Sequence, residues 1–123
     1  MIVGFEDFTQ DVKDSEIEII NLIARGLRER VGGHKAITNA SMRALLYANK
    51  EIMVSDAKMR KYIQYIRAYN LVPMLCASRI GYWVASSPEE FIKYREGYVS
   101  RIRAMEFTKA CMFHYEIKNN VTN

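Results

Sequence analysis

The sequence has 123 residues, the length of one ordinary domain, which excludes large multidomain enzyme architectures. Hydrophobic residues make up 50% and charged residues 26%, a composition typical of globular rather than disordered or fibrous proteins. No apolar run is long enough to span a membrane, and the early acidic residues exclude a secretory signal. Because the two cysteines, Cys76 and Cys111, form neither a disulfide framework nor a CxxC pair, we expect a reduced, cytoplasmic protein.

The net charge of +4 is unevenly distributed along the chain. Residues 1–20 hold six acids and one base, a net charge of −5, whereas the remainder carries +9. Residues 57–88 contain five bases and no acid. Such a basic, acid-poor stretch is the electrostatic footprint of a nucleic-acid-binding protein, although an ordinary solvated surface gives the same pattern.

The pattern predicts a short N-terminal arm over residues 1–13, followed by a helix. Asp14 or Ser15 is the expected cap of this helix, and Gly32 with Gly33 is the expected stop. Apolar residues recur between them at helical spacing, at Ile17, Ile20, Ile23, Ala24, Leu27 and Val31.

Two further helices are predicted in the middle of the chain. Residues 36–38 form a short extended stub, and Thr38 or Asn39 then caps a helix that carries Met42, Leu45 and Leu46. The turn between this helix and the next is expected within residues 49–54. Ser55 caps a third helix from Asp56 to about Tyr69. Its apolar stripe contains Met59, Tyr62, Ile63 and Ile66, and its opposite face contains Lys58, Arg60, Lys61, Gln64 and Arg67.

A β-hairpin and a long helix complete the prediction. Residues 71–77 and 82–85 are the expected strands, joined by a turn over residues 78–81. Ser87-Pro88-Glu89-Glu90 is a strong helix start, with an N-cap serine and a proline at the first helical position. The helix is expected from about residue 88 to 116, so that residues 14–116 form a single domain and residues 117–123 a flexible tail.

This order of elements, mainly α with a small β-hairpin (α+β), is the layout of a winged helix-turn-helix domain with an added N-terminal helix and a long C-terminal helix. The matching residues are Ile37-Thr38, Ser55-Asp56, Met59-Arg60, Ile63, Ile66-Arg67, Val72-Pro73-Met74, Ser78, Gly81-Tyr82-Trp83-Val84-Ala85 and Ser87-Pro88-Glu89-Glu90. The more specific part is Gly81-Tyr82-Trp83 followed by Ser87-Pro88-Glu89-Glu90. On these residues, roughly half of the chain resembles a family of small winged-helix DNA-binding domains of bacterial and phage proteins. The connection between residues 46 and 55 is longer than is typical of the family, Asn70 replaces the usual glycine, and the first 35 residues have no counterpart.

The resemblance implies sequence-specific binding of double-stranded DNA. The candidate contacts lie on the third helix, at its start, at the start of the second helix and at the tip of the hairpin. On the third helix they are Lys58, Arg60, Lys61 and Gln64, and at its start Ser55 and Asp56. At the start of the second helix they are Thr38 and Asn39, and at the hairpin tip Arg79. Arginine, lysine and glutamine bond base edges or phosphates. The competing interpretations are a solvated face for the lysines and arginines, a pairing of Arg60 with an acid, and simple helix capping for Ser55, Thr38 and Asn39.

The sequence offers little for catalysis or metal binding. His34 and His114 are far apart and lack neighbouring ligands, and no hydrolase, metalloprotease or nucleotide-binding motif occurs. We therefore expect no enzyme activity, no catalytic residue, no metal site and no cofactor. Cys76 is interpreted as a buried residue of the hairpin, and Trp83 as core or hairpin packing.

The last helix is longer than a small domain needs, and Tyr98, Ile102, Met105 and Met112 fall near one face of it. This face either packs against the first helix or forms a homodimer, and we expect the homodimer. The sequence thus predicts a nucleoid-associated cytoplasmic protein that regulates transcription or replication of a phage, mobile element or bacterial chromosome by occupancy or recruitment. The alternatives are a protein-interaction module, such as an inhibitor of a host protein, and a structural subunit.

Overall fold

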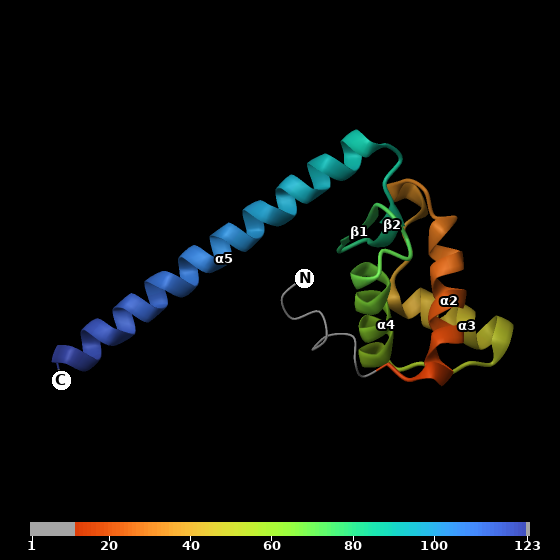
Figure 1. Ribbon diagram of the computed structural model, residues 1–123, viewed down its shortest axis with the longest axis horizontal. Helices are drawn as coiled ribbons and strands as arrows, with labels where there is room; N and C mark the ends of the chain where they lie inside the picture. The colour runs from red at the N-terminus through yellow and green to blue at the C-terminus, as the bar shows by residue number, and fades with distance from the viewer. Residues whose placement is uncertain (1–11, 123) are drawn as a thin grey trace. The chain divides into compact units, whose positions relative to one another are not determined.

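The computed structural model describes residues 12–122 and the side chains of residues 12–117, so most of the expected arm (1–13) lies outside the described residues. The elements are α2 (Asp14–Arg28), the 3₁₀ turn η1 (Gly33–Lys35), α3 (Asn39–Lys50), α4 (Asp56–Ala68), β1 (Leu75–Ser78), β2 (Gly81–Val84) and α5 (Pro88–Thr122). This order confirms the expected fold class: mainly α, with one two-stranded antiparallel hairpin and a long C-terminal helix (Figure 1). The chain divides into two compact units between Pro88 and Glu89.

The N-cap of helix α2 lies one residue before Asp14, the earlier of the two predicted caps. Lys13 is the N-cap residue, and its backbone N–H donates to Glu16 Oε1 over 3.2 Å. The helix ends at Arg28, so the prediction that Val31 continues its apolar face is wrong. Val31 forms a bridge to Val84 instead. The helix stops because the backbone here bonds β2: Gly32 N–H donates to the Val84 carbonyl and Val84 N–H to the Arg30 carbonyl.

The expected extended stub is confirmed by its pairing with the hairpin. Ile37 and Tyr82 exchange both backbone hydrogen bonds, with N–O distances of 3.0 and 2.8 Å. Tyr82 packs against the core, whereas Trp83 lies on the other face of the strand, opposite Cys76, and is half-buried. Cys76 is fully buried, as expected. Of these two neighbouring aromatic residues, Tyr82 therefore packs against the main hydrophobic core and Trp83 does not.

Both predicted caps of the central helices are confirmed. Thr38 Oγ1 accepts the Ser41 N–H over 3.1 Å at the start of α3, and Ser55 Oγ accepts the Lys58 N–H over 3.1 Å at the start of α4. Helix α3 continues into the segment expected to be the turn and ends at Lys50, where Glu51 adopts a left-handed conformation (φ 56°). The connection to α4 therefore spans residues 51–55.

The hairpin is shorter than predicted at its start. Residues 71–74 form bends and a turn, in which Met74 has a φ of 59°, and β1 begins only at Leu75. The register pairs Leu75 with Val84 and Ser78 with Gly81, which leaves Arg79 and Ile80 as the two-residue tip. Proline at position 73 removes a backbone donor, which opposes an earlier start of the strand.

A single hydrophobic core holds the first unit together. Apolar side chains from α2, the stub, α3, α4 and the hairpin form one cluster, and its most buried members include Ile20, Leu27, Met59, Tyr62 and Ile66. Figure 1 shows α2, α3 and α4 close together, with the hairpin at one end of α4. All four predicted apolar positions of α4 are buried. The other sides of α4 carry the exposed residues Ala57, Lys58, Arg60, Gln64 and Arg67.

Helix α5 is a unit of its own. It starts at Pro88 as predicted but extends to Thr122, so residues 117–122, expected to form a tail, belong to the helix. Every residue from Arg95 to Ile117 is exposed. The four residues predicted for dimerisation lie within this stretch: Tyr98, Ile102, Met105 and Met112 are 45%, 42%, 71% and 67% exposed.

Gly81 is the tightest point between the hairpin and the stub. Its φ is +120°, and a Cβ atom at this position would lie 2.4 Å from the Ile37 carbonyl oxygen. A side chain there requires both an unfavourable backbone conformation and the displacement of the Ile37–Tyr82 hydrogen bonds.

We predict that Gly81→Val lowers the free energy of unfolding by more than about 2 kcal/mol, because the strain and the backbone clash add. The matched control is Gly26→Ala in α2, where an added Cβ meets nothing within 4 Å. That change should stabilise the protein by about 0.5–1 kcal/mol through helix propensity. Urea denaturation measures both. Equal stability of Gly81→Val and the unmodified protein would contradict the close approach.

Candidate nucleic-acid interface

The exposed face of α4 carries most of the predicted DNA contacts. With Met59, Tyr62, Ile63 and Ile66 in the core, helical spacing places Ala57, Lys61, Gln64 and Ala68 along the line farthest from it. Gln64 is exposed and Lys61 is half-buried. The outermost line of α4 therefore combines small residues, which permit close approach, with one cation and one amide.

Lys58 lies on one flank of this face and is turned toward α2. Its ammonium is 3.7 Å from the Glu16 carboxylate, and 59% of its side chain remains exposed. Glu16 is one of the acids of the negative N-terminal stretch, so the acidic segment reaches the basic helix at this point. Part of the positive charge of Lys58 is therefore neutralised within the protein.

Arg60 lies on the opposite flank and pairs with Asp56. Its guanidinium is 2.7 Å from Asp56 Oδ2, one helical turn away, and both side chains are more than half exposed. The pairing of Arg60 with an acid, considered from the sequence, is confirmed. An exposed pair of this kind contributes little to stability, but it holds the guanidinium over the start of α4.

The starts of α3 and α4 are joined by a polar network. Asn39 Nδ2 donates to the Asp56 carbonyl oxygen over 3.3 Å, and Arg43 Nε donates to Asn39 Oδ1 over 2.7 Å. Together with the Arg60–Asp56 pair, these contacts connect Arg43, Asn39, Asp56 and Arg60 in one continuous series, which we call the α3–α4 edge. The edge unites Asn39 and Asp56, predicted separately, and adds a second arginine.

Arg43 is a candidate contact that the sequence pattern did not reveal. It is half-buried, and only its Nε is engaged in the described part of the chain, so its two terminal nitrogens remain available. The signal that identifies it is the i,i+4 spacing from Asn39 on a helix that begins at Asn39. An arginine held by an amide in this way is suited to bonding a phosphate or a guanine edge.

The base of the hairpin lies close to Thr38, the residue before Asn39 of the α3–α4 edge. The position of a Cβ on Gly81 would be 2.9 Å from the Thr38 nitrogen, so the hairpin base lies against the N-cap residue of α3. Arg79, two residues earlier, is exposed at the hairpin tip and has no hydrogen bond or ion pair among the described residues. Ser55 caps α4 at the other end of the edge. The predicted contacts therefore follow a path from the hairpin across the starts of α3 and α4.

A buried acid fixes α2 against α4 behind this surface. Glu16 is 8% exposed and accepts a hydrogen bond from the Tyr62 hydroxyl, as well as the bond from the Lys13 N–H. The Tyr62 hydrogen bond, followed by the Lys13 N–H, holds the pKa of Glu16 below its ordinary value of 4.5. Burial, together with the bond to Glu16, raises the pKa of Tyr62 to about 12.

Other kinds of site have less support within residues 12–122. The described residues contain no group of three or more metal-binding side chains. None of the described helices combines the length and apolar character needed to cross a membrane.

We predict that Tyr62→Phe lowers the free energy of unfolding by about 1–3 kcal/mol near neutral pH, because Glu16 loses its main donor in a buried setting. The lowered pKa of Glu16 stabilises the folded protein above pH 4.5, and this stabilisation is lost as the pH falls further. The raised pKa of Tyr62 stabilises it below pH 10, and this stabilisation is lost as the pH rises toward about 12.

Both pH-dependent losses should shrink in Tyr62→Phe, measured as urea denaturation curves across pH. Tyr47→Phe is the control, since Tyr47 is 57% exposed and the change should alter stability by less than about 0.5 kcal/mol. An unchanged acid limb in Tyr62→Phe would show that the bond to Glu16 does not contribute.

Comparisons of the chain with protein-family models, curated proteins and solved structures found no match. The function must therefore be inferred from the surface itself: an exposed basic helix, an arginine-bearing edge linked by hydrogen bonds, and an arginine at a hairpin tip.

Proposed function

We propose that the protein binds double-stranded DNA sequence-specifically and regulates transcription or replication by occupancy or recruitment. The observation that carries the proposal is the α3–α4 edge, in which Asn39 links the two helix starts and two arginines flank the bond. The edge lies beside the exposed face of α4, whose width as a single helix suits the major groove of DNA. Its setting in a phage, mobile element or bacterial chromosome comes from the resemblance to winged-helix domains.

The division of roles follows from the geometry. In this proposal Lys61 and Gln64, which lie on the side of α4 farthest from the core, contact base edges, whereas Arg43, Arg60 and Arg79 lie beside that side. Marginal cations contact phosphates and fix the register of the protein on the duplex. Lys58 contributes less, because Glu16 already compensates its charge.

The exposed α5 supports a homodimer as part of this function. Tyr98, Met105 and Met112 recur every seven residues, and Ile102 occupies the second position of the same heptad pattern. Lys109 and Glu116 continue the Ile102 series, and polar residues at such positions select the register of paired helices. A dimer presents two reading helices to a pseudo-palindromic site.

The alternative function is a protein-interaction module, for example an inhibitor of a host protein. The large exposed apolar residues of α5, such as Phe107 and Phe113, favour it, because aromatic residues are enriched at protein interfaces. Binding to DNA that responds to salt and to changes on α4 separates the two functions.

We predict that Arg60→Gln combined with Lys61→Gln weakens binding to random-sequence duplex DNA. The slope of log affinity against log salt should fall by about one unit for each phosphate that the variant no longer neutralises. Lys58 is left unchanged, because its ion pair with Glu16 would mix a stability effect into the result. Fluorescence polarisation at several salt concentrations measures the slope. If either residue meets a base, selection from a random pool should show relaxed preference at one position.

The control is Arg25→Gln combined with Lys93→Gln, which removes the same charge from exposed positions outside α3, α4 and the hairpin. Its slope should match that of the unmodified protein. Equal weakening in both double variants would indicate unspecific attraction between charges, and unmodified protein that fails to bind any duplex would favour the interaction module.

We predict that the protein is a dimer at micromolar concentration and that Ile102→Asp or Met105→Asp makes it a monomer, because a charge is costly in an apolar interface. Phe107→Asp is the matched control, since position 107 lies on the opposite side of the heptad pattern and is 71% exposed, as Met105 is. Sedimentation velocity gives the mass of each variant. A monomeric unmodified protein would contradict the dimer.

A further inference from the structure

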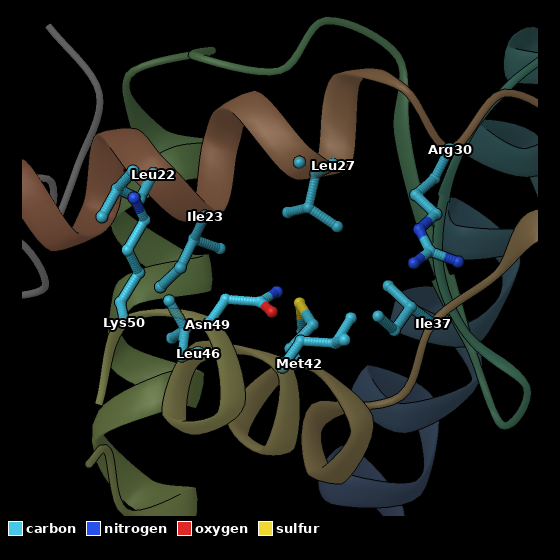
Figure 2. Close-up of a pocket in the computed structure, with 11 residues that line it drawn as sticks. Leu22, Ile23, Leu27, Arg30, Ile37, Met42, Leu46, Asn49 and Lys50 are labelled. Atoms are coloured by element: carbon cyan, nitrogen blue, oxygen red, sulfur yellow. The ribbon is translucent and has the colours of Figure 1, made fainter. Parts of the chain in front are cut away.

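A pocket of about 230 Å³ lies between α2 and α3, away from the α3–α4 edge. Its walls are mainly apolar and come from both helices and the stub: Leu22, Ile23, Leu27, Ile37, Met42, Leu45 and Leu46. Figure 2 shows the side chains of α2 and α3 facing one another across it. The deep residues are buried, whereas Leu45 at the rim is 45% exposed.

The polar groups around this pocket carry positive charge and no negative charge. Arg30 and Lys50 lie at its two ends and Asn49 between them, and no acid lines it. Figure 2 shows the Asn49 amide directed into the space below Leu27 and the Lys50 ammonium beside Leu22. Neither Asn49 nor Lys50 has a side-chain hydrogen bond or ion pair among residues 12–117. The apolar walls thus come with an available cation and an available amide.

We propose that this pocket binds a small molecule with an apolar body and a carboxylate. An apolar cavity of about 150 Å³ holds a benzene ring, so a pocket of 230 Å³ admits one ring or a branched aliphatic chain with a short extension. The apolar body replaces water against Ile23, Leu27 and Met42, while the carboxylate accepts from Lys50 and Asn49. Because the lining residues include two cations and no acid, they favour an anionic head group, and the ligand class of the proposal is an aromatic or branched aliphatic carboxylate.

The proposal does not rest on DNA binding, since the pocket residues are distinct from the α3–α4 edge. The two sites share helix α3: Met42, Leu45 and Leu46 face the pocket, and Asn39 and Arg43 belong to the edge. A ligand that contacts the second half of α3 is therefore attached to an element of the proposed DNA surface.

The test uses phenylacetate as the probe and phenylacetamide as its uncharged match, added to the full chain with labelled methionine and leucine methyl groups. We expect phenylacetate to shift the Met42 and Leu46 methyl signals with a Kd of about 1 mM, as befits a ligand of about ten non-hydrogen atoms. Phenylacetamide should bind about tenfold more weakly. The Met105 signal on α5 should not move.

Two variants locate the site. Lys50→Gln should reduce phenylacetate affinity to that of phenylacetamide, whereas Lys35→Gln, outside the pocket, should leave it unchanged. Gly26→Leu should abolish binding while the protein stays folded, because Gly26 lines the pocket and a Cβ there meets nothing within 4 Å.

The proposal is overturned if neither compound moves the Met42 and Leu46 signals at concentrations tenfold above the expected Kd. Equal affinity for both compounds, or binding that survives Gly26→Leu, also overturns it. Signals that move with protein concentration alone would show that a second copy covers the pocket instead.

Discussion

The hydrogen bond between Tyr62 and Glu16 joins the first turn of α2 to the middle of α4, across 46 positions of sequence. A carboxylate that is only 8% exposed has to be satisfied by donors, and three groups surround this one: the Tyr62 hydroxyl, the Lys13 N–H and the Lys58 ammonium. Because two of these come from α4, the rotation of α4 about its axis is set relative to α2. That rotation decides which side chains of α4 meet solvent, and the whole candidate interface follows from it.

A second constraint acts at the other end of the surface. Ile37 pairs with Tyr82 only because Gly81 has no side chain, and this pairing brings the hairpin to the N-cap residue of α3. From there Asn39 reaches the Asp56 carbonyl. Backbone hydrogen bonds thus place the hairpin against the start of α3, and the Asn39 side chain, which also accepts from Arg43, links the start of α3 to the start of α4.

The central helices α3 and α4 and their caps could be predicted because they depend on local sequence. Serine and threonine caps at Ser55 and Thr38, and the apolar spacing of α4, are properties of short windows, and the structure bears them out. The end of α2 could not be predicted, since Val31 has the correct spacing for a helix but its neighbours bond the distant strand β2. The start of β1 was misjudged for a related reason: Leu71 and Val72 are apolar because they cover the core, not because they form a strand.

The sequence predicts which residues of the candidate site are charged, but not which residues they contact. Residue type identified Arg60, Lys61 and Arg79 as cations in an acid-poor stretch. In the structure Arg60 is exposed on α4, Arg79 is exposed at the hairpin tip, and Lys61 is half-buried. The partners of these residues depend on tertiary contacts. The ion pair of Lys58 with Glu16 connects the basic helix α4 to the acidic N-terminal stretch, and the charge counts of the two segments do not reveal this contact. Arg43 lies outside the acid-poor stretch, and its importance comes from a neighbour on α4 that only the fold supplies.

The exposure of α5 has a consequence for how firmly any contact along it is held. From Arg95 to Ile117 every residue is exposed, and the side-chain contacts described for this stretch lie within the helix, such as Arg101 over the Tyr98 ring. Helices without tertiary packing have only marginal stability in water, so a partner that binds α5 must also order the helix. The entropic cost of ordering the helix weakens the binding free energy, which makes the contact readily reversible. The helix content of α5 therefore depends on the concentration of its binding partner.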